Sequence, residues 1–193
     1  MPCSVGSYCP TGTPGDAACP AGFYCPGVSS LIECPSAYFC ANRSTAPIIC
    51  PAGFYCPIPS LMFQCPAGHF CPPGSTAQGP CESDGHYCAA GSSARSVCPA
   101  GYYCSASSQK TECSPGYYSN AGSVSCMSCP VGSYCPQAGA TAPTACDKGT
   151  FCPAARMSSA TRCPKGANCL SVGMSAPTPG TLFSELPLHV PNS

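Results

Sequence analysis

Cysteine recurs along this chain with a nearly fixed period. Eleven short repeats each open on a cysteine, and consecutive opening cysteines are 15 to 17 residues apart. Nine repeats place a second cysteine six residues after the first, as in Cys19 and Cys25. Such a period is typical of one small structural unit stacked on copies of itself, each touching its neighbours. The opening cysteines are Cys3, Cys19, Cys34, Cys50, Cys65, Cys81, Cys98, Cys113, Cys129, Cys146 and Cys163.

The composition leaves too little aliphatic material for a large apolar core. Leu, Ile, Val and Phe number 24 of 193 residues, whereas cysteine alone numbers 22. Cysteine at this density is typical of a disulfide scaffold in an oxidising compartment. We therefore predict a small disulfide-rich repeat fold: an elongated rod of eleven repeats of about 16 residues, with turns, short β-hairpins and almost no helix. Residues 1–169 form the array, and residues 170–193 form a cysteine-free C-terminal tail.

The repeats follow the consensus Cys-Pro-x-Gly-x-aromatic-Cys-Pro, from which individual repeats depart at single positions. Glycine stands third after the opening cysteine in nine of the eleven repeats, which predicts either a turn with positive φ or a close backbone approach beside the disulfide. An aromatic residue, such as Tyr24 or Tyr55, precedes the second cysteine. We expect these rings to stack between repeats as a thin apolar spine. An exposed aromatic stripe that binds sugar or another ligand is the alternative.

The repeat that opens at Cys113 is irregular and bears on the disulfide pairing. Ser119 stands where its second cysteine should be, and an additional cysteine follows at Cys126. Pairing inside each repeat absorbs this shift, whereas pairing between successive repeats joins Cys126 to Cys129 and leaves both end cysteines without partners. Sequential pairing is favoured: 3–9, 19–25, 34–40, 50–56, 65–71, 81–88, 98–104, 113–126, 129–135, 146–152 and 163–169. The second cysteines are thus Cys9, Cys25, Cys40, Cys56, Cys71, Cys88, Cys104, Cys126, Cys135, Cys152 and Cys169.

Residues 113–136 also carry a family resemblance. They read Cys-x-Pro-Gly-Tyr-Tyr-Ser-x-Ala-Gly-x-x-Ser-Cys-x-x-Cys-Pro-x-Gly-x-Tyr-Cys-Pro, which resembles the ephrin-receptor-like cysteine-rich repeat, related in style to TNF-receptor and EGF-like modules. The resemblance implies a secreted or surface protein with elongated disulfide-bonded arrays, in adhesion, matrix or coat roles, and no catalytic residues. The other ten repeats share the opening of this motif but differ in cysteine placement.

Few residues have the chemistry of an enzyme or a metal site. The chain has three histidines, no nucleophile or phosphate-binding motif, and a single Cys-x2-Cys spacing, at Cys126 and Cys129. We expect no catalytic residues, no cofactor and no metal. Glu82, Asp84 and His86 gather in one irregular repeat, where a cation site is weighed against a solvated insertion loop.

Charge and hydropathy limit the partners. Seven acidic and seven basic residues cancel, which argues against binding to nucleic acid or anionic lipid. No apolar run has the length of about 20 residues that spans a membrane. No apolar leader precedes Cys3, so the sequence is either a mature form or a segment of a longer protein.

Two further features suggest glycosylation and assembly. Asn42-Arg43-Ser44 is an N-glycosylation sequon in an expected surface loop, so we predict a glycan on Asn42. The cysteine-free tail suits an extended strand with one apolar face. We expect it to dock on a neighbouring copy by strand addition or to fold back on its own repeats. Its large apolar residues are Leu182, Phe183, Leu186, Leu188 and Val190.

The leading hypothesis is a structural extracellular repeat protein, a subunit of a glycosylated fibre, surface hair or coat assembled head to tail. The alternative is a receptor- or adhesin-type cysteine-rich ectodomain that binds a protein or glycan. Self-association into filaments favours the first, and a monomer with one tight partner favours the second. Both place the chain outside the cell or at its surface.

Overall fold

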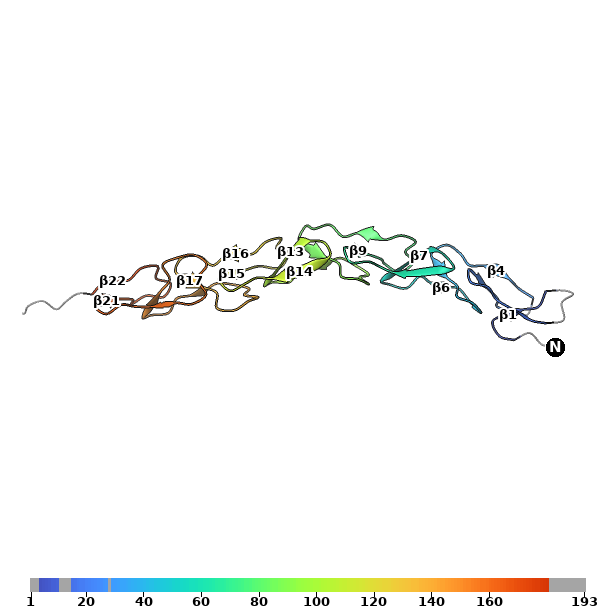
Figure 1. The fold of residues 1–193 in the computed structure, drawn as a ribbon, viewed down its shortest axis with the longest axis horizontal. Coiled ribbons are helices and arrows are strands. Elements are labelled where there is room, and N and C mark those ends of the chain that lie inside the picture. The colour runs from blue at the N-terminus through green and yellow to red at the C-terminus, as the bar shows by residue number, and fades with distance from the viewer. Residues whose placement is uncertain (1–3, 11–14, 28, 181–193) are drawn as a thin grey trace, which may run out of the picture. The chain divides into compact units, whose positions relative to one another are not determined.

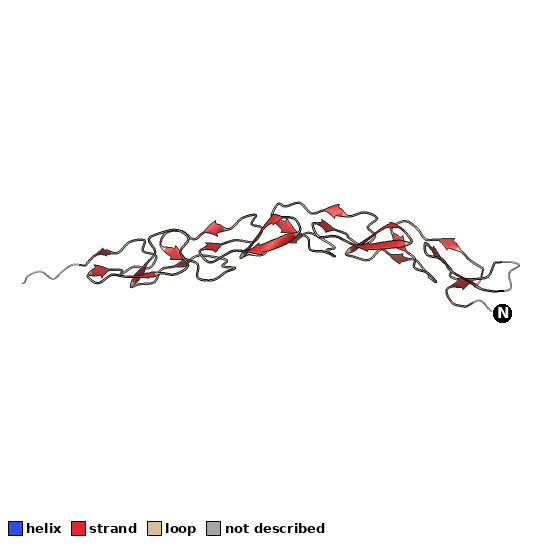
Figure 2. Cartoon of the chain, viewed as in Figure 1, coloured by secondary structure: helices blue, strands red, loops and turns tan. Residues whose placement is uncertain are grey.

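The chain folds as a succession of very short β-hairpins. A computed structural model describes residues 4–10, 15–27 and 29–180. In this part the chain forms twenty-two strands and no helix (Figure 2). The strands form eleven two-stranded sheets, each of which joins two strands that are consecutive in the sequence. This confirms the predicted class of small disulfide-rich repeat. Among the described residues, none belongs to a helix that could cross a membrane.

Nine of the hairpins have strands of two residues, and the β7–β8 and β13–β14 hairpins are longer. The strands are β1 (Ser7–Tyr8), β2 (Ala17–Ala18), β3 (Phe23–Tyr24), β4 (Ile32–Glu33), β5 (Tyr38–Phe39), β6 (Ile48–Ile49), β7 (Phe54–Ile58), β8 (Leu61–Gln64), β9 (His69–Phe70), β10 (Gly79–Pro80), β11 (His86–Tyr87), β12 (Ser96–Val97), β13 (Tyr102–Ala106), β14 (Gln109–Glu112), β15 (Tyr117–Tyr118), β16 (Met127–Ser128), β17 (Ser133–Tyr134), β18 (Thr144–Ala145), β19 (Thr150–Phe151), β20 (Thr161–Arg162), β21 (Ala167–Asn168) and β22 (Thr178–Pro179).

The repeat pattern explains where each hairpin forms. The first strand holds the aromatic position and the residue before it, and the second strand ends just before the next opening cysteine. The glycine before the first strand has a positive φ, as at Gly22 with φ of 85°. Ala37 adopts the same conformation, with φ of 71°, in the repeat that lacks this glycine. The predicted left-handed turn is therefore confirmed.

The chain divides into two compact units. One contains residues 1–98 and 104–110, and the other contains residues 99–103 and 111–193. Within each unit the hairpins follow one another in chain order (Figure 1). Residues 170–180 complete the eleventh hairpin through β22, so the repeat structure continues past Cys169, where the sequence placed the end of the array.

Disulfide-bonded cysteines form the core. Eighteen cysteines, together with Ser7 and Ser119, provide the buried side chains of the described residues. The aromatic rings beside them are mostly half-buried, and Tyr55 and Phe63 pair within one hairpin at 5.6 Å between centroids. The described bridges join Cys19–Cys25, Cys34–Cys40, Cys50–Cys56, Cys65–Cys71, Cys81–Cys88, Cys98–Cys104, Cys113–Cys126, Cys129–Cys135, Cys146–Cys152 and Cys163–Cys169.

Backbone hydrogen bonds join each repeat to the next. Between the repeats that open at Cys50 and Cys65, Gly53 N–H donates to the Cys71 carbonyl at 2.9 Å, and Cys56 N–H donates to the Ser75 carbonyl at 2.8 Å. In return, Gly74 N–H donates to the Cys50 carbonyl at 2.8 Å. The same three bonds recur between the repeats that open at Cys129 and Cys146. We call this set of bonds the inter-repeat ladder.

Each repeat was expected to touch only its neighbours. The structure shows that contacts also form between repeats that are two places apart in the array. A Cβ added to Gly53 would collide with the carbonyl oxygen of Gly91, which lies two repeats further along. Gly132 stands in the same relation to Gly173. The repeat glycine therefore has two roles: it adopts the positive φ of the turn and leaves room for a backbone that approaches closely.

Candidate functional site

Not all of the predicted site residues fall within the described chain. Cys3 and the predicted assembly residues Leu182, Phe183, Leu186, Leu188 and Val190 lie outside the described residues. Cys9, the predicted partner of Cys3, is disulfide-bonded. No free cysteine is found in the part of the chain that the structure describes.

In the repeat that opens at Cys81, the acidic side chains of Glu82 and Asp84 bind an arginine of the same chain. Arg95, from the loop before β12, forms an ion pair with Asp84, and its Nη1 lies 3.8 Å from Glu82 Oε2. His86 Nδ1 lies 2.9 Å from Asp84 Oδ1. No group of three metal-ligating side chains occurs among residues 4–10, 15–27 and 29–180. The cluster is therefore an exposed charge network, and sequence reasoning missed Arg95 because it is not in the same turn.

This network perturbs the ionisation of Asp84. The guanidinium of Arg95 and, secondarily, the ring of His86 lower the pKa of Asp84 to about 2. Asp84 in turn raises the pKa of Arg95. The carboxylate is thus charged over the physiological range, and the ion pair ties the enlarged turn to the following loop.

The β7–β8 hairpin presents an exposed apolar face. Tyr55 pairs with Phe63 and Ile58 with Leu61 across the two strands. Residues 61 and 63 alternate with residue 62 along the strand, so these four side chains share one face. Ile58 is 50% exposed, and Leu61 and Phe63 are each 45% exposed. We call Tyr55, Ile58, Leu61 and Phe63 the apolar hairpin face.

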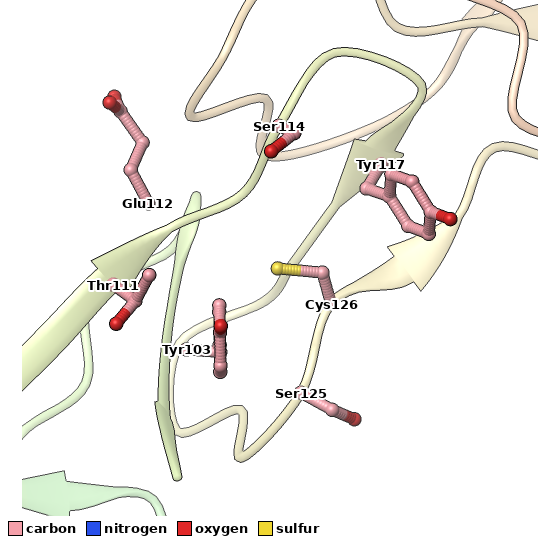
Figure 3. Close-up of a pocket in the computed structure, with 7 residues that line it drawn as sticks. All are labelled: Tyr103, Thr111, Glu112, Ser114, Tyr117, Ser125 and Cys126. Carbon is pink, nitrogen blue, oxygen red and sulfur yellow. The ribbon is translucent and has the colours of Figure 1, made fainter. Parts of the chain in front are cut away.

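A shallow groove of about 390 Å³ lies in the second compact unit. In Figure 3 the side chain of Cys126 lies between those of Tyr103 and Tyr117, and serine and threonine hydroxyls surround them. Two aromatic rings and several hydroxyl groups are the donor set that suits a polyhydroxylated ligand such as a sugar. The lining residues are Tyr103, Thr111, Glu112, Ser114, Tyr117, Ser125 and Cys126.

The irregular repeat that opens at Cys113 creates this groove. Because Ser119 replaces the second cysteine, the disulfide of Cys113 runs to Cys126, which lies at the groove. Ser114 stands where most repeats have proline. The sequence identified this repeat as irregular, but the groove requires residues 103 and 111, which belong to the preceding hairpin.

Asn42 lies in an exposed turn between β5 and β6. Its Oδ1 accepts a hydrogen bond of 2.9 Å from the backbone N–H of Ala21, and the Ser44 hydroxyl donates to the Ala41 carbonyl at 2.8 Å. The amide nitrogen, to which an N-glycan is attached, is not used by this bond to Ala21.

Among the described residues, the inter-repeat ladder has no continuation beyond the eleventh repeat. At this position no hydrogen bond within the described chain is found for Gly166 N–H, Cys169 N–H or the Cys163 carbonyl, whereas most of their equivalents in earlier repeats, such as Gly132 N–H, Cys135 N–H and the Cys129 carbonyl, are bonded to the following repeat. No described atom lies within 4 Å of a Cβ placed on Gly149 or Gly166. We call these backbone groups and the two uncovered glycines the open end.

No protein-family model and no curated protein sequence matches this chain.

Proposed function

We propose that this chain is a structural protein of the extracellular space or cell surface, a subunit of a fibre, surface hair or coat that assembles head to tail. The open end carries the proposal. In most repeats the same backbone groups are bonded to the next repeat, so the last described repeat presents donors and an acceptor that match those of a further repeat. The first repeat of a second molecule shares the sequence pattern of the repeats that complete the ladder within the chain.

The geometry of such a contact favours a filament. The open end of one molecule meets a different surface on the next, which makes the contact heterologous. Heterologous contacts propagate into open filaments unless their rotation closes a ring. Addition of the tail, residues 181–193, to the same neighbour would strengthen the contact, because an extended segment contributes main-chain hydrogen bonds and apolar side chains together.

The rest of the proposal follows from cysteine content and surface chemistry. A core of cystine requires an oxidising compartment, which supports a secreted or surface location. The exposed Asn42 supports a glycoprotein. We propose no catalytic activity and no cofactor, and the resemblance to ephrin-receptor-like repeats fits an adhesion, matrix or coat role.

Sedimentation of the purified oxidised chain tests the proposal. We expect large species to form with rising concentration. Gly149→Asn should suppress them, because asparagine tolerates the φ of 83° at this position and its side chain would occupy the uncovered space. Ser158→Asn, which places an asparagine on an exposed loop, serves as the control. A chain that stays monomeric at all concentrations, or assembles equally well with Gly149→Asn, would contradict head-to-tail stacking through the open end.

The groove favours a second candidate function, a cysteine-rich ectodomain that binds a glycan. Binding of oligosaccharides to the chain, followed by tyrosine fluorescence, tests this candidate. Tyr103→Ala and Tyr117→Ala should each abolish binding, whereas Tyr24→Ala, in the other compact unit, should not. If no oligosaccharide binds, or if all three variants bind equally, this candidate is refuted.

A further inference from the structure

The apolar hairpin face is not explained by the fold of its own hairpin. The β13–β14 hairpin has the same lengths, five and four residues, and the same pattern of burial as β7–β8. Yet the positions of Ile58, Leu61 and Phe63 are taken there by Ala106, Gln109 and Thr111. A hairpin of this shape therefore forms without large apolar side chains at these positions.

The anchoring of the two hairpins supports the same conclusion. Cys40 N–H donates to the Pro59 carbonyl at the tip of β7–β8 at 2.9 Å. In the equivalent bond, Cys88 N–H donates to the Ser107 carbonyl at 2.8 Å. The backbone holds both tips, so this anchoring does not depend on the exposed side chains of Ile58, Leu61 and Phe63. A cluster of exposed large apolar side chains is typical of an interaction surface.

The surroundings of the face limit its partner to an apolar one. Residues 44–81 contain no Asp, Glu, Lys or Arg, whereas β14 carries Lys110 and Glu112. A partner rich in charge would lose hydration on this surface without gaining an ion pair.

The C-terminal segment of the chain has the matching composition. Residues 181–193 include five large apolar residues, with Glu185 as the only fully charged side chain. Leu186, Leu188 and Val190 alternate, so in an extended chain they share one face. The segment begins directly after Gly180, beside the open end, and thirteen extended residues reach about 45 Å. In a head-to-tail contact it would therefore run along the first repeats of the next molecule.

We infer that the apolar hairpin face of one molecule binds residues 181–193 of the preceding molecule, with Leu186, Leu188 and Val190 packed against Ile58, Leu61 and Phe63. This inference rests on the proposed head-to-tail assembly and names the receptor site for the tail. Pro187 and Pro191 lack an N–H and limit main-chain pairing to one edge of the segment, so the tail ends on its receptor and does not seed a growing sheet.

A binding experiment on full-length chains tests the inference. The receptor is the chain with Leu186→Ser, Leu188→Ser and Val190→Ser, whose own tail cannot compete, and the probe is a fluorescent peptide of residues 181–193. Transfer of the β13–β14 residues to the face, by Ile58→Ala, Leu61→Gln and Phe63→Thr, should weaken binding about tenfold or more. The transferred residues already occur in a hairpin of the same shape, and peptide mapping without reduction, which should find native bridges such as Cys50–Cys56, verifies that the variant folds.

Controls separate this inference from the proposed function. Met62→Lys, which introduces the equivalent residue of β14 on the opposite face, should leave peptide binding unchanged. A photo-cross-linker is placed at position 188 in a mixture of isotope-labelled and unlabelled chains. We expect cross-links that join two different molecules and that attach to β8.

The possible results divide clearly. Equal binding to both receptors, no binding to either, or cross-links only within one molecule would each overturn the inference. If the inference fails in one of these ways but the wild-type chain still forms filaments, the proposed function remains supported. If the wild-type chain forms no filaments, the proposed function itself is refuted.

Discussion

The Ser119 hydroxyl donates a hydrogen bond of 2.7 Å to the Tyr102 carbonyl. Ser119 is fully buried, at the position where the neighbouring repeats have a disulfide-bonded cysteine. Its backbone N–H donates to the Ala140 carbonyl at 3.1 Å, as the second cysteine of a regular repeat does to the following loop. A serine thus preserves the inter-repeat ladder where the disulfide has moved to Cys126.

Removal of this hydroxyl should weaken the fold modestly. Ser119→Ala deletes the donor to Tyr102 and should lower the free energy of unfolding by about 0.5–1.5 kcal/mol. Denaturant unfolding of the oxidised protein measures the change. Ser123→Ala removes an exposed hydroxyl from the same repeat and is the control. Equal stability of both variants and the wild type would show that the buried bond contributes nothing.

The irregular repeat should be convertible to a regular one. Ser119→Cys combined with Cys126→Ser restores the six-residue spacing, and we expect a bridge between positions 113 and 119 in a folded chain. Peptide mapping without reduction identifies the bridge. A persistent free thiol at position 119 would show that this site does not accept the regular geometry.

Two glycines with nearly the same backbone conformation should differ in their tolerance of alanine. Gly132 has φ of 82° and Gly149 has φ of 83°, so alanine at either carries the left-handed penalty of about 1–2 kcal/mol. Only at Gly132 would the new Cβ also collide with the Gly173 carbonyl, which should add about 1–3 kcal/mol. Unfolding of the two monomeric variants measures the difference. Equal losses would refute the contact between alternate repeats.

The charge network predicts a specific pH dependence. Because Arg95 and His86 lower the folded-state pKa of Asp84 to about 2, its contribution to stability is present above the ordinary value of 3.8. This contribution is lost as the pH falls through about 2. Carboxyl NMR should place the midpoint near 2 in the wild type, and Arg95→Ala should move it upward. An unchanged midpoint in Arg95→Ala would rule out this ion pair.

Oxidation of the cysteines is the basis of the fold. We expect all 22 cysteines to be oxidised and reduction to unfold the chain, since the remaining apolar content cannot offset chain entropy. Alkylation without reduction, followed by mass spectrometry, should find no modified cysteine, and circular dichroism should follow the loss of structure. Several alkylated thiols, or a native spectrum after reduction, would contradict this expectation.

The period of the sequence predicted the local structure well. Each glycine before an aromatic pair indicated a left-handed turn, and φ of 85° at Gly22 agrees with it. This success is local because the turn and the strand pairing depend on residues within one repeat. The displaced cysteine at Cys126 suggested pairing within repeats for the same reason, and the structure joins it to Cys113.

The packing of repeats against one another was less predictable from the sequence. A close backbone approach at the repeat glycine was one of the two expectations, but a fixed period does not determine the rotation between repeats, so it did not indicate that the Gly91 carbonyl is the group that approaches Gly53. The expected aromatic spine is likewise replaced by a core of cystine, with the rings beside it. Arg95 escaped notice because its partner Asp84 is eleven residues away and is brought near by the β11–β12 hairpin. Such contacts depend on the geometry between elements, which residue spacing alone does not specify.

Electron microscopy of the purified, oxidised full-length chain tests head-to-tail stacking most directly. We predict filaments that lengthen with concentration, in which helical reconstruction places Gly149 and Gly166 of one molecule against the first repeats of the next and shows the hairpin period continuing across the junction. Isolated molecules at every concentration, or filaments joined side by side with Gly149 and Gly166 uncovered, would contradict the proposal.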